Sequence, residues 1–370
     1  MATNHKSRSE YTVGWMCALP KEQAAAIAML DEEHPDFSDQ PSSDKNTYTL
    51  GSIGSHNIVI ACLPMGIYGT NSAATAANHM ITTFPSIKIG LLVGIGGGIP
   101  PSVRLGDVVV SSPLGEFPGV VQWDFGKAEE GGKFKRIGAL NKPPRLLLTA
   151  VSKLRARHYL GGGSQIPKYL QDMKTRWPST DSSFTQCGSL KDPSLAPDNL
   201  HRGQNAWLTV LSVFCRIVLA LIGFDMGGWP FFTTGRSEET GGRASVDAGI
   251  DGDQGKGKDV AVHYGLIASG NMVIKDSERR DSLNKSLGGD VLCVEMEAAG
   301  IMNDFPCVVI RGICDYADSR KNDEWQNYAA AVAAGCAMEL LGYVLPSDVD
   351  GERPAKEILG NGESALFSGT

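Results

Sequence analysis

The chain has 370 residues, of which 42% are hydrophobic and 20% are charged. This length and apolar content suit one large α/β domain or two smaller domains, and they exclude a disordered chain and a disulfide-stapled miniprotein. The formal net charge of −7 argues against a general nucleic-acid binder, because nucleic acids are polyanions. The 44 glycines occur in clusters without a fixed period, which excludes collagen.

The eight cysteines indicate a reducing compartment. No two of them form a C-x-x-C pair and no HExxH spacing occurs, so the sequence predicts no metal site and no cofactor. Several lie in apolar, strand-like runs, where cysteine usually acts as a small buried hydrophobe. The N-terminal stretch MATNHKSRSEYTVGW lacks the apolar run of a signal peptide. We therefore expect a cytoplasmic protein.

The first 115 residues alternate between strand and helix patterns. We predict strands at 11–18, 48–51, 57–63, 88–93 and 108–111, with the second and third forming a hairpin. Helices are predicted at 21–30, after Pro20 in the first turn, and at 71–82. The pattern weakens after residue 115. Regular α/β patterning resumes at Val260 and holds to about Leu345, with buried strands at 291–294 and 307–314.

A compositionally foreign segment interrupts this pattern at about 198–258. Its run Trp207–Phe224 is strongly apolar, but Arg216 at the middle of the run costs at least about 2.5 kcal/mol in a membrane, so we expect no membrane partner. Two origins fit the segment: an insertion in a surface loop and translated intron sequence. The last residues, 346–370, are polar and are expected to form a tail.

The most prominent glycine run, Gly94–Gly98, follows the predicted strand 88–93. A dinucleotide-binding loop needs a third glycine and then a helix N-terminus that faces the pyrophosphate. Ile99 stands at that glycine position and two prolines follow, so this fingerprint fails. Two interpretations stay open: a tight turn, and a glycine loop that lets a small ligand approach the backbone at Ile95 and Gly96.

Acidic residues stand at the ends of the two later strands. Glu295 and Glu297 follow the strand 291–294, either as a solvated helix N-terminus or as carboxylates that accept hydrogen bonds from sugar hydroxyls. Asp315 ends the strand 307–314, where ligands bind in open α/β sheets. It is either a helix N-cap or a general acid, whose pKa burial beside other carboxylates would raise. Glu22, taken alone, is an ordinary acid in the first turn of a helix.

Together these blocks resemble the purine and uridine phosphorylase superfamily, and within it the methylthioadenosine/S-adenosylhomocysteine nucleosidase branch. The resemblance covers residues 11–160 and 260–345 and is most specific at Val294–Ala298 (VEMEA) and Arg311–Asp318 (RGICDYAD). The block QWDFGK at 122–127 looks like the version found in filamentous fungi, where it commonly belongs to the N-terminal domain of NOD-like receptors or ankyrin proteins.

The resemblance implies one domain over residues 11–345, interrupted at 198–258, with a three-layer α/β/α fold around a mixed, partly closed central sheet. It also implies a homodimer or a larger homo-oligomer. By the same resemblance, Asp315 would protonate the purine base and Glu22 would activate the attacking water. Glu297 would hold the ribose hydroxyls. The other expected contacts with substrate are Met296 on the sugar, Val273 and Ile274 at the base, and Ile95 and Gly96 in the glycine run.

The same resemblance favours hydrolysis over phosphorolysis. Phosphorylases of the superfamily hold phosphate with arginines near the first turn and the glycine loop, but residues 17–23 and 93–98 contain none. Glu22 would repel a phosphate dianion and suits a water molecule. The sequence therefore predicts a purine nucleosidase whose partner is a purine nucleoside or nucleotide of the adenine type. The alternatives are a phosphate-dependent purine nucleoside phosphorylase and a catalytically degenerate module that senses nucleotides or oligomerises.

Overall fold

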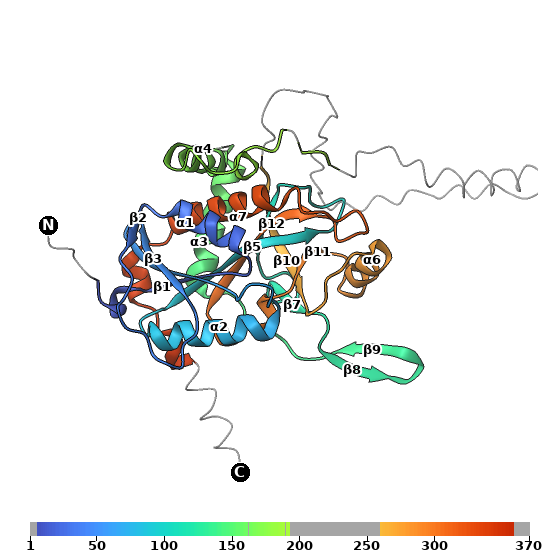
Figure 1. Ribbon diagram of the computed structural model, residues 1–370. Coiled ribbons are helices and arrows are strands. Elements are labelled where there is room, and N and C mark those ends of the chain that lie inside the picture. The colour runs from blue at the N-terminus through green and yellow to red at the C-terminus, as the bar shows by residue number, and fades with distance from the viewer. Residues whose placement is uncertain (1–5, 162, 189, 193–259, 359–370) are drawn as a thin grey trace, which may run out of the picture. The chain divides into compact units, whose positions relative to one another are not determined.

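The computed structural model describes residues 6–161, 163–188, 190–192 and 260–358 (Figure 1). The described chain up to Leu190 and from residue 260 onward forms one compact unit. The foreign segment 198–258, with its apolar run Trp207–Phe224, lies outside the described residues.

The strands and helices alternate through most of this unit. The strands are β1 (Val13–Cys17), β2 (Glu32–His34), β3 (Tyr48–Ile53), β4 (His56–Cys62), β5 (Ile89–Gly98), β6 (Val108–Ser111), β7 (Val120–Gln122), β8 (Gly126–Glu129), β9 (Lys133–Arg136), β10 (Val262–Ser269), β11 (Val291–Glu295) and β12 (Cys307–Asp315). The helices are α1 (Pro20–Met29), α2 (Thr70–Thr83), α3 (Arg145–Tyr159), α4 (Ile166–Arg176), α6 (Ser277–Ser286), α7 (Gln326–Leu341) and α8 (Pro346–Asp350). The strands and helices predicted in the first 115 residues are confirmed to within a few residues, except that β5 continues to Gly98.

The central sheet is mixed and closes on itself at one end. Its strands lie in the order β11-β10-β6-β12-β5-β1-β4-β3-β2. The pairs of β1 with β4 and β5, and of β12 with β5, are parallel, whereas β12 and β6 are antiparallel. β11 pairs with β10 and, antiparallel, with β5 through Val294 and Gly97. Because β11 meets both ends of the path from β10 to β5, this part of the sheet is closed, as the family resemblance implied.

The glycine run is a strand, so both its interpretation as a tight turn and its interpretation as a loop are wrong. Gly94–Gly98 continues β5 and pairs with β12 on one side and with β11 on the other. Two neighbouring strands supply backbone partners along the run, and this pairing outweighs the low strand propensity of glycine. A Cβ on Gly94 would collide with the Glu22 carboxylate and the Arg311 guanidinium. Glycine is therefore required where two charged side chains pass over the strand.

Helices cover both faces of the sheet, which gives the three α/β/α layers. α1, α4 and α7 lie over one face and α2 lies over the other (Figure 1). α7 is buried along most of its length, and it packs so closely on β12 that a Cβ on Gly312 would collide with the backbone of Ala329. Small side chains on α7 thus let the helix approach the strands that carry the candidate site.

The chain after β12 ends in elements that pack on the core. α8 buries Val349, and further on the Ala355 amide donates a hydrogen bond of 2.7 Å to the Ile87 carbonyl. Val349 and Ala355 of the expected polar tail therefore pack on the domain. In the described part of the chain no single helix is long and apolar enough to span a membrane; α7 and Pro346–Ile358 pass that test only as a pair bent by 83°.

Candidate active site

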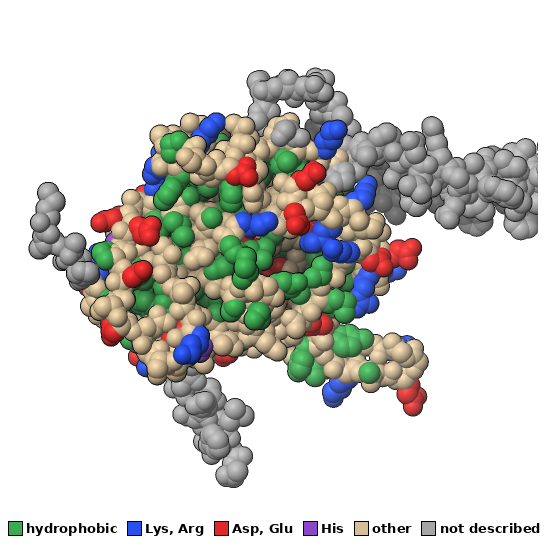
Figure 2. All heavy atoms as spheres, in the orientation of Figure 1, with side chains coloured by type: hydrophobic (Ala, Val, Ile, Leu, Met, Phe, Trp, Pro, Cys, Tyr) green, Lys and Arg blue, Asp and Glu red, His purple; other side chains and the backbone are tan. Residues whose placement is uncertain are grey.

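A cavity of about 420 Å³ opens at the carboxyl ends of β1, β11 and β12, beside the last residues of β5. Figure 2 shows a hollow on this face with hydrophobic and basic side chains at its edge. Every residue that the sequence singled out as a site residue lines this cavity: Glu22, Ile95, Gly96, Val273, Ile274, Met296, Glu297 and Asp315. The fold therefore brings together positions that are spread over almost three hundred residues of chain.

Glu22 is buried at the start of α1, where it does not behave as a solvated first-turn residue. Its side chain is turned back so that Oε2 accepts hydrogen bonds from the amides of Ala18, at 2.6 Å, and Leu19, at 3.0 Å. Oε1 accepts a hydrogen bond of 2.8 Å from the Ile95 amide on β5. Burial raises the pKa of Glu22, against the opposing effects of Arg311 and of these three amides. The result is a fixed carboxylate that can accept a proton.

Glu297 lies at the end of β11 and shares its surroundings with another buried carboxylate and a guanidinium. Its Oε2 is 3.2 Å from Nη2 of Arg311, which also forms an ion pair with Glu295. Its Oε1 accepts a hydrogen bond of 3.3 Å from the Gly69 amide. Burial raises the pKa of Glu297 to about 7, Arg311 opposes this, and the charges of Glu295 and Glu22 add to it. Because only 6% of Glu297 is exposed, a solvated helix N-terminus is excluded.

Glu295 and Arg311 form the buried base of the site. Glu295 accepts hydrogen bonds from the amides of Glu297, at 3.1 Å, and Ala298, at 3.0 Å, so it holds the turn that carries Glu297. Burial by itself lowers the pKa of Arg311, but Glu295, Glu297 and Glu22 outweigh it and raise that pKa. Arg311 therefore stays charged and is already paired with carboxylates.

Asp315 is buried at the end of β12 and does not cap a helix, since α7 begins only at Gln326. Its Oδ1 accepts a hydrogen bond of 2.8 Å from the amide of Ala317, a residue held at φ 51°. The expectation that Asp315 lies next to other carboxylates is corrected here. The charged group in contact with it is the ammonium of Lys321, with Nζ 2.6 Å from Oδ2.

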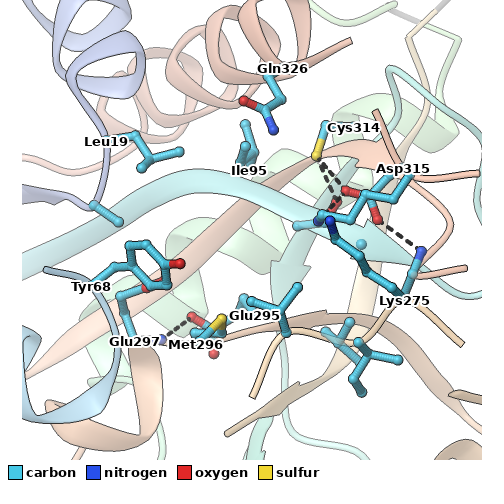
Figure 3. A pocket seen from close by; sticks show the side chains of 18 of the residues that line it. Leu19, Tyr68, Ile95, Lys275, Glu295, Met296, Glu297, Cys314, Asp315 and Gln326 are labelled. Atoms are coloured by element: carbon cyan, nitrogen blue, oxygen red, sulfur yellow. Dashed lines mark hydrogen bonds and ion pairs between the residues drawn. The ribbon is translucent and has the colours of Figure 1, made fainter. Parts of the chain in front are cut away.

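The residues that line the cavity lie on two opposite sides of it. Figure 3 shows Tyr68, Met296 and Glu297 on one side of the cavity and Cys314 and Asp315 on the other. Val273 and Ile274 line the cavity from the loop between β10 and α6; Ile274 is buried and Val273 is exposed.

Several residues at the cavity were not predicted to be site residues: Tyr68, Met272, Lys275, Lys321, Asp323 and Gln326. Arg311 was quoted only as part of a motif, although a charged residue inside the apolar strand CVVIRGIC is a signal for a buried ion pair. The sequence around Lys321 does not indicate an ion pair. Lys321 lies in a polar loop, and its contact with Asp315 depends on the conformation of that loop.

A cavity lined by buried carboxylates at the strand ends of a partly closed α/β sheet is a site for a small polar molecule. The model of one family, described as Phosphorylase superfamily, matches residues 12–159 and 244–344. The chain belongs to this superfamily.

Its relatives include an NLR-like protein and nucleosidases. A nucleotide-binding leucine-rich repeat (NLR)-like protein of Hyaloscypha variabilis is 42% identical over 97% of this chain and 32% of its own length. The ATP nucleosidase Cap17 of Escherichia coli is 25% identical over 86% of this chain and 48% of its own length. The chain thus spans about a third and about half of these two relatives.

A solved structure with the same fold is the 5′-methylthioadenosine/S-adenosyl homocysteine nucleosidase of Helicobacter pylori. It matches with a TM-score of 0.52 and 15% identity, and the match covers 90% of this chain and 98% of that one.

Proposed function

We propose that this chain hydrolyses the N-glycosidic bond of a purine nucleoside or nucleotide. The proposal is supported by the superfamily, by relatives and fold neighbours that are named nucleosidases, and by the carboxylates that line the cavity. Breaking this bond leaves a sugar with oxocarbenium character and a base that is a poor leaving group. A catalyst therefore needs a proton donor at the base and negative charge near the sugar.

Asp315 and Glu297 fit these two tasks because they lie on different sides of the cavity (Figure 3). Asp315 would deliver a proton to N7 of the purine as the bond to the sugar breaks. Positioned acids of this kind contribute about 10²–10⁴-fold to a rate. Glu297 would accept hydrogen bonds from the sugar hydroxyls, with Met296 packed on the sugar and the loop that carries Val273 and Ile274 beside the base.

The observation that carries the choice of water as nucleophile is the setting of Glu22. Its carboxylate is fixed by three backbone amides, and burial raises its pKa, so it can take a proton from a bound water. Glu22, Glu295 and Glu297 together carry up to three negative charges against the single buried charge of Arg311. A phosphate dianion placed there would be repelled, because Arg311 is already occupied by two carboxylates.

A panel of substrates in phosphate-free buffer tests this function. Adenosine, 5′-methylthioadenosine, S-adenosylhomocysteine and ATP are incubated with the full chain, and free base and free sugar are quantified by chromatography. We expect adenine and a sugar with a free anomeric hydroxyl from at least one of them, at a rate that does not change when phosphate is added. Strict dependence on phosphate, with a sugar 1-phosphate as product, would make the protein a phosphorylase instead.

A self-associating, cytoplasmic protein is part of the same proposal. Met65, Ile67 and Tyr68 lie close together in the chain, and all three side chains are exposed. Tyr68 also lines the cavity. An exposed apolar group of this kind is a common signature of an association surface. Sedimentation of the purified chain tests it; a monomer at micromolar concentration would exclude a stable homo-oligomer.

A further inference from the structure

The ion pair between Lys321 and Asp315 raises a question about the proton that the base receives. Lys321 lies in the loop between β12 and α7, lines the cavity, and places its Nζ 2.6 Å from Oδ2 of Asp315. The side chain of Asp315 is 3% exposed and that of Lys321 is 24% exposed. In a contact of this kind the carboxylate is ionised and the ammonium holds the proton. An ionised Asp315 alone has no proton to donate to N7.

We propose that Lys321 is the proton reservoir for departure of the base, and that Asp315 passes the proton on. The inference rests on the proposed function above. As the bond between C1′ and N9 breaks, its electron pair moves onto the purine, whose affinity for a proton rises. The Asp315 carboxylate takes the proton from Nζ of Lys321 and passes it to N7, which leaves Asp315 as a carboxylate and Lys321 as a neutral amine.

Glu22 accepts the proton that the attacking water loses. The water oxygen bonds to C1′ and one water proton moves to the Glu22 carboxylate. The sum is one nucleoside and one water converted to free base and free sugar, with one proton moved from Lys321 to Glu22. Exchange with solvent then restores both groups. The reaction needs no other reactant.

The charges around the ion pair keep Lys321 protonated in the resting protein. Burial lowers the pKa of Lys321, but the Asp315 carboxylate outweighs it, and the net effect is a raised pKa. Among the described residues, two other titratable groups lie close to the pair: the Cys314 thiol, which is 3.1 Å from Oδ2 of Asp315, and the Asp323 carboxylate, whose charge raises the pKa of Lys321. Lys321 therefore keeps its proton to alkaline pH.

The pH dependence of kcat separates this role from that of a salt bridge that only holds the loop. We compare the full-length wild type with Lys321→Met and with a matched control, Arg320→Met. The control removes a cation from the same loop, where Arg320 pairs with Asp318 at 3.0 Å. Wild type and control should keep their kcat into alkaline pH. Lys321→Met should lose about 10²-fold or more above pH 8, and the loss should become smaller as the pH falls, because the proton must then come from solvent.

Chemical rescue of a second variant tests the same role if Lys321→Met folds poorly. Lys321→Ala leaves space for a small amine, so ethylammonium should restore its activity in a saturable way and should not stimulate wild type or Arg320→Met. Circular dichroism checks that each variant is folded. If the Lys321 variants show the pH profile of wild type, whatever the size of the loss, and no rescue by amine, the proton reservoir is refuted while the nucleosidase stands. If wild type releases no base from any substrate of the panel, the proposed function fails and this inference falls with it.

Discussion

The backbone amide of Ile95 donates a hydrogen bond of 2.8 Å to the carboxylate of Glu22, so the glycine strand β5 and the helix α1 are joined at the floor of the cavity. The bond forms because Gly94 has no side chain between them. The carboxylate of Glu22 and the guanidinium of Arg311 both occupy the space that a Cβ at residue 94 would fill. Gly94 thus makes room for two charged groups, whereas Gly90 and Gly98 of the same strand make room for apolar side chains.

Gly94→Ala should therefore damage both stability and activity. The added methyl group must displace Glu22 or Arg311, and overpacking of this kind costs about 1–3 kcal/mol. We expect a lower midpoint of chemical denaturation and a loss of base release of about 10²-fold or more, because Glu22 leaves its three amides. Gly335→Ala on α7 is the control, since its Cβ would meet nothing nearer than 3.4 Å. Equal stability of both variants would contradict the packing argument.

Asp315→Asn should lower kcat by about 10²-fold or more with little change in KM, since it removes a proton transfer made in the transition state. The control is Asp318→Asn in the same turn, a carboxylate that pairs with Arg320. Asp318→Asn should keep most of the activity. Steady-state kinetics on the best substrate of the panel decide the matter. A folded Asp315→Asn variant with nearly full kcat would show that another group protonates the base.

Sequence reasoning located the strands and two of the candidate carboxylates for a physical reason. The buried strands β1, β5, β11 and β12 contain short apolar runs, and polar residues that follow such runs gather at the carboxyl edge of the sheet. This singled out Glu297 and Asp315, whereas Glu22 was assigned to the site by the family resemblance. All three line one cavity, and their catalytic roles are still predictions.

Sequence patterns could not predict strand pairing, ion pairs or burial that depend on residues distant in the chain. Gly94–Gly98 was expected to form a turn or a loop after the predicted strand 88–93, but pairing with β11 and β12 decides its conformation. The contact of Lys321 with Asp315 depends on the path of a loop that has no periodic pattern. Ala355 gave no signal of burial because single apolar residues in a polar stretch are usually exposed.

The pH dependence of kcat/KM should show an acidic limb near pH 7. Burial raises the pKa of Glu297 to about 7, and its ionised form is the one that can accept hydrogen bonds from two sugar hydroxyls. We therefore expect kcat/KM to rise with pH through this value. Glu297→Gln should raise KM, lower kcat and flatten the limb. A limb that persists unchanged in Glu297→Gln would assign it to a different group, of which Glu22 is the first candidate.

The same pKa shift predicts how stability changes with pH. The folded protein holds a proton on Glu297 that the unfolded chain releases between pH 4.5 and about 7. The folded state binds more protons in this range, so the contribution of Glu297 to the free energy of unfolding falls as pH rises through it. Denaturant titrations of wild type and Glu297→Gln at several pH values check the sign. The variant should lose this part of the pH dependence, and a steeper fall in the variant would contradict it.

Replacing residues 203–256 with a short Gly/Ser linker should preserve both folding and base release. Every residue to which we assign a role in the reaction lies outside this range, and the described chain on its two sides forms one compact unit. Changing the length of a surface connection costs little closure entropy. The apolar run Trp207–Phe224 favours association if it is exposed, so its removal should also improve solubility.

The control replaces α4 (Ile166–Arg176) with the same linker. This helix buries Ile166, Leu170 and Met173, and large-to-small changes at such positions cost about 2–5 kcal/mol each, so the control should be strongly destabilised. Thermal unfolding and base release are measured for both variants against the full chain. If the variant that lacks 203–256 unfolds like the control, or folds but no longer binds substrate, the segment is a core or pocket element of the enzyme and neither an added loop nor intron sequence.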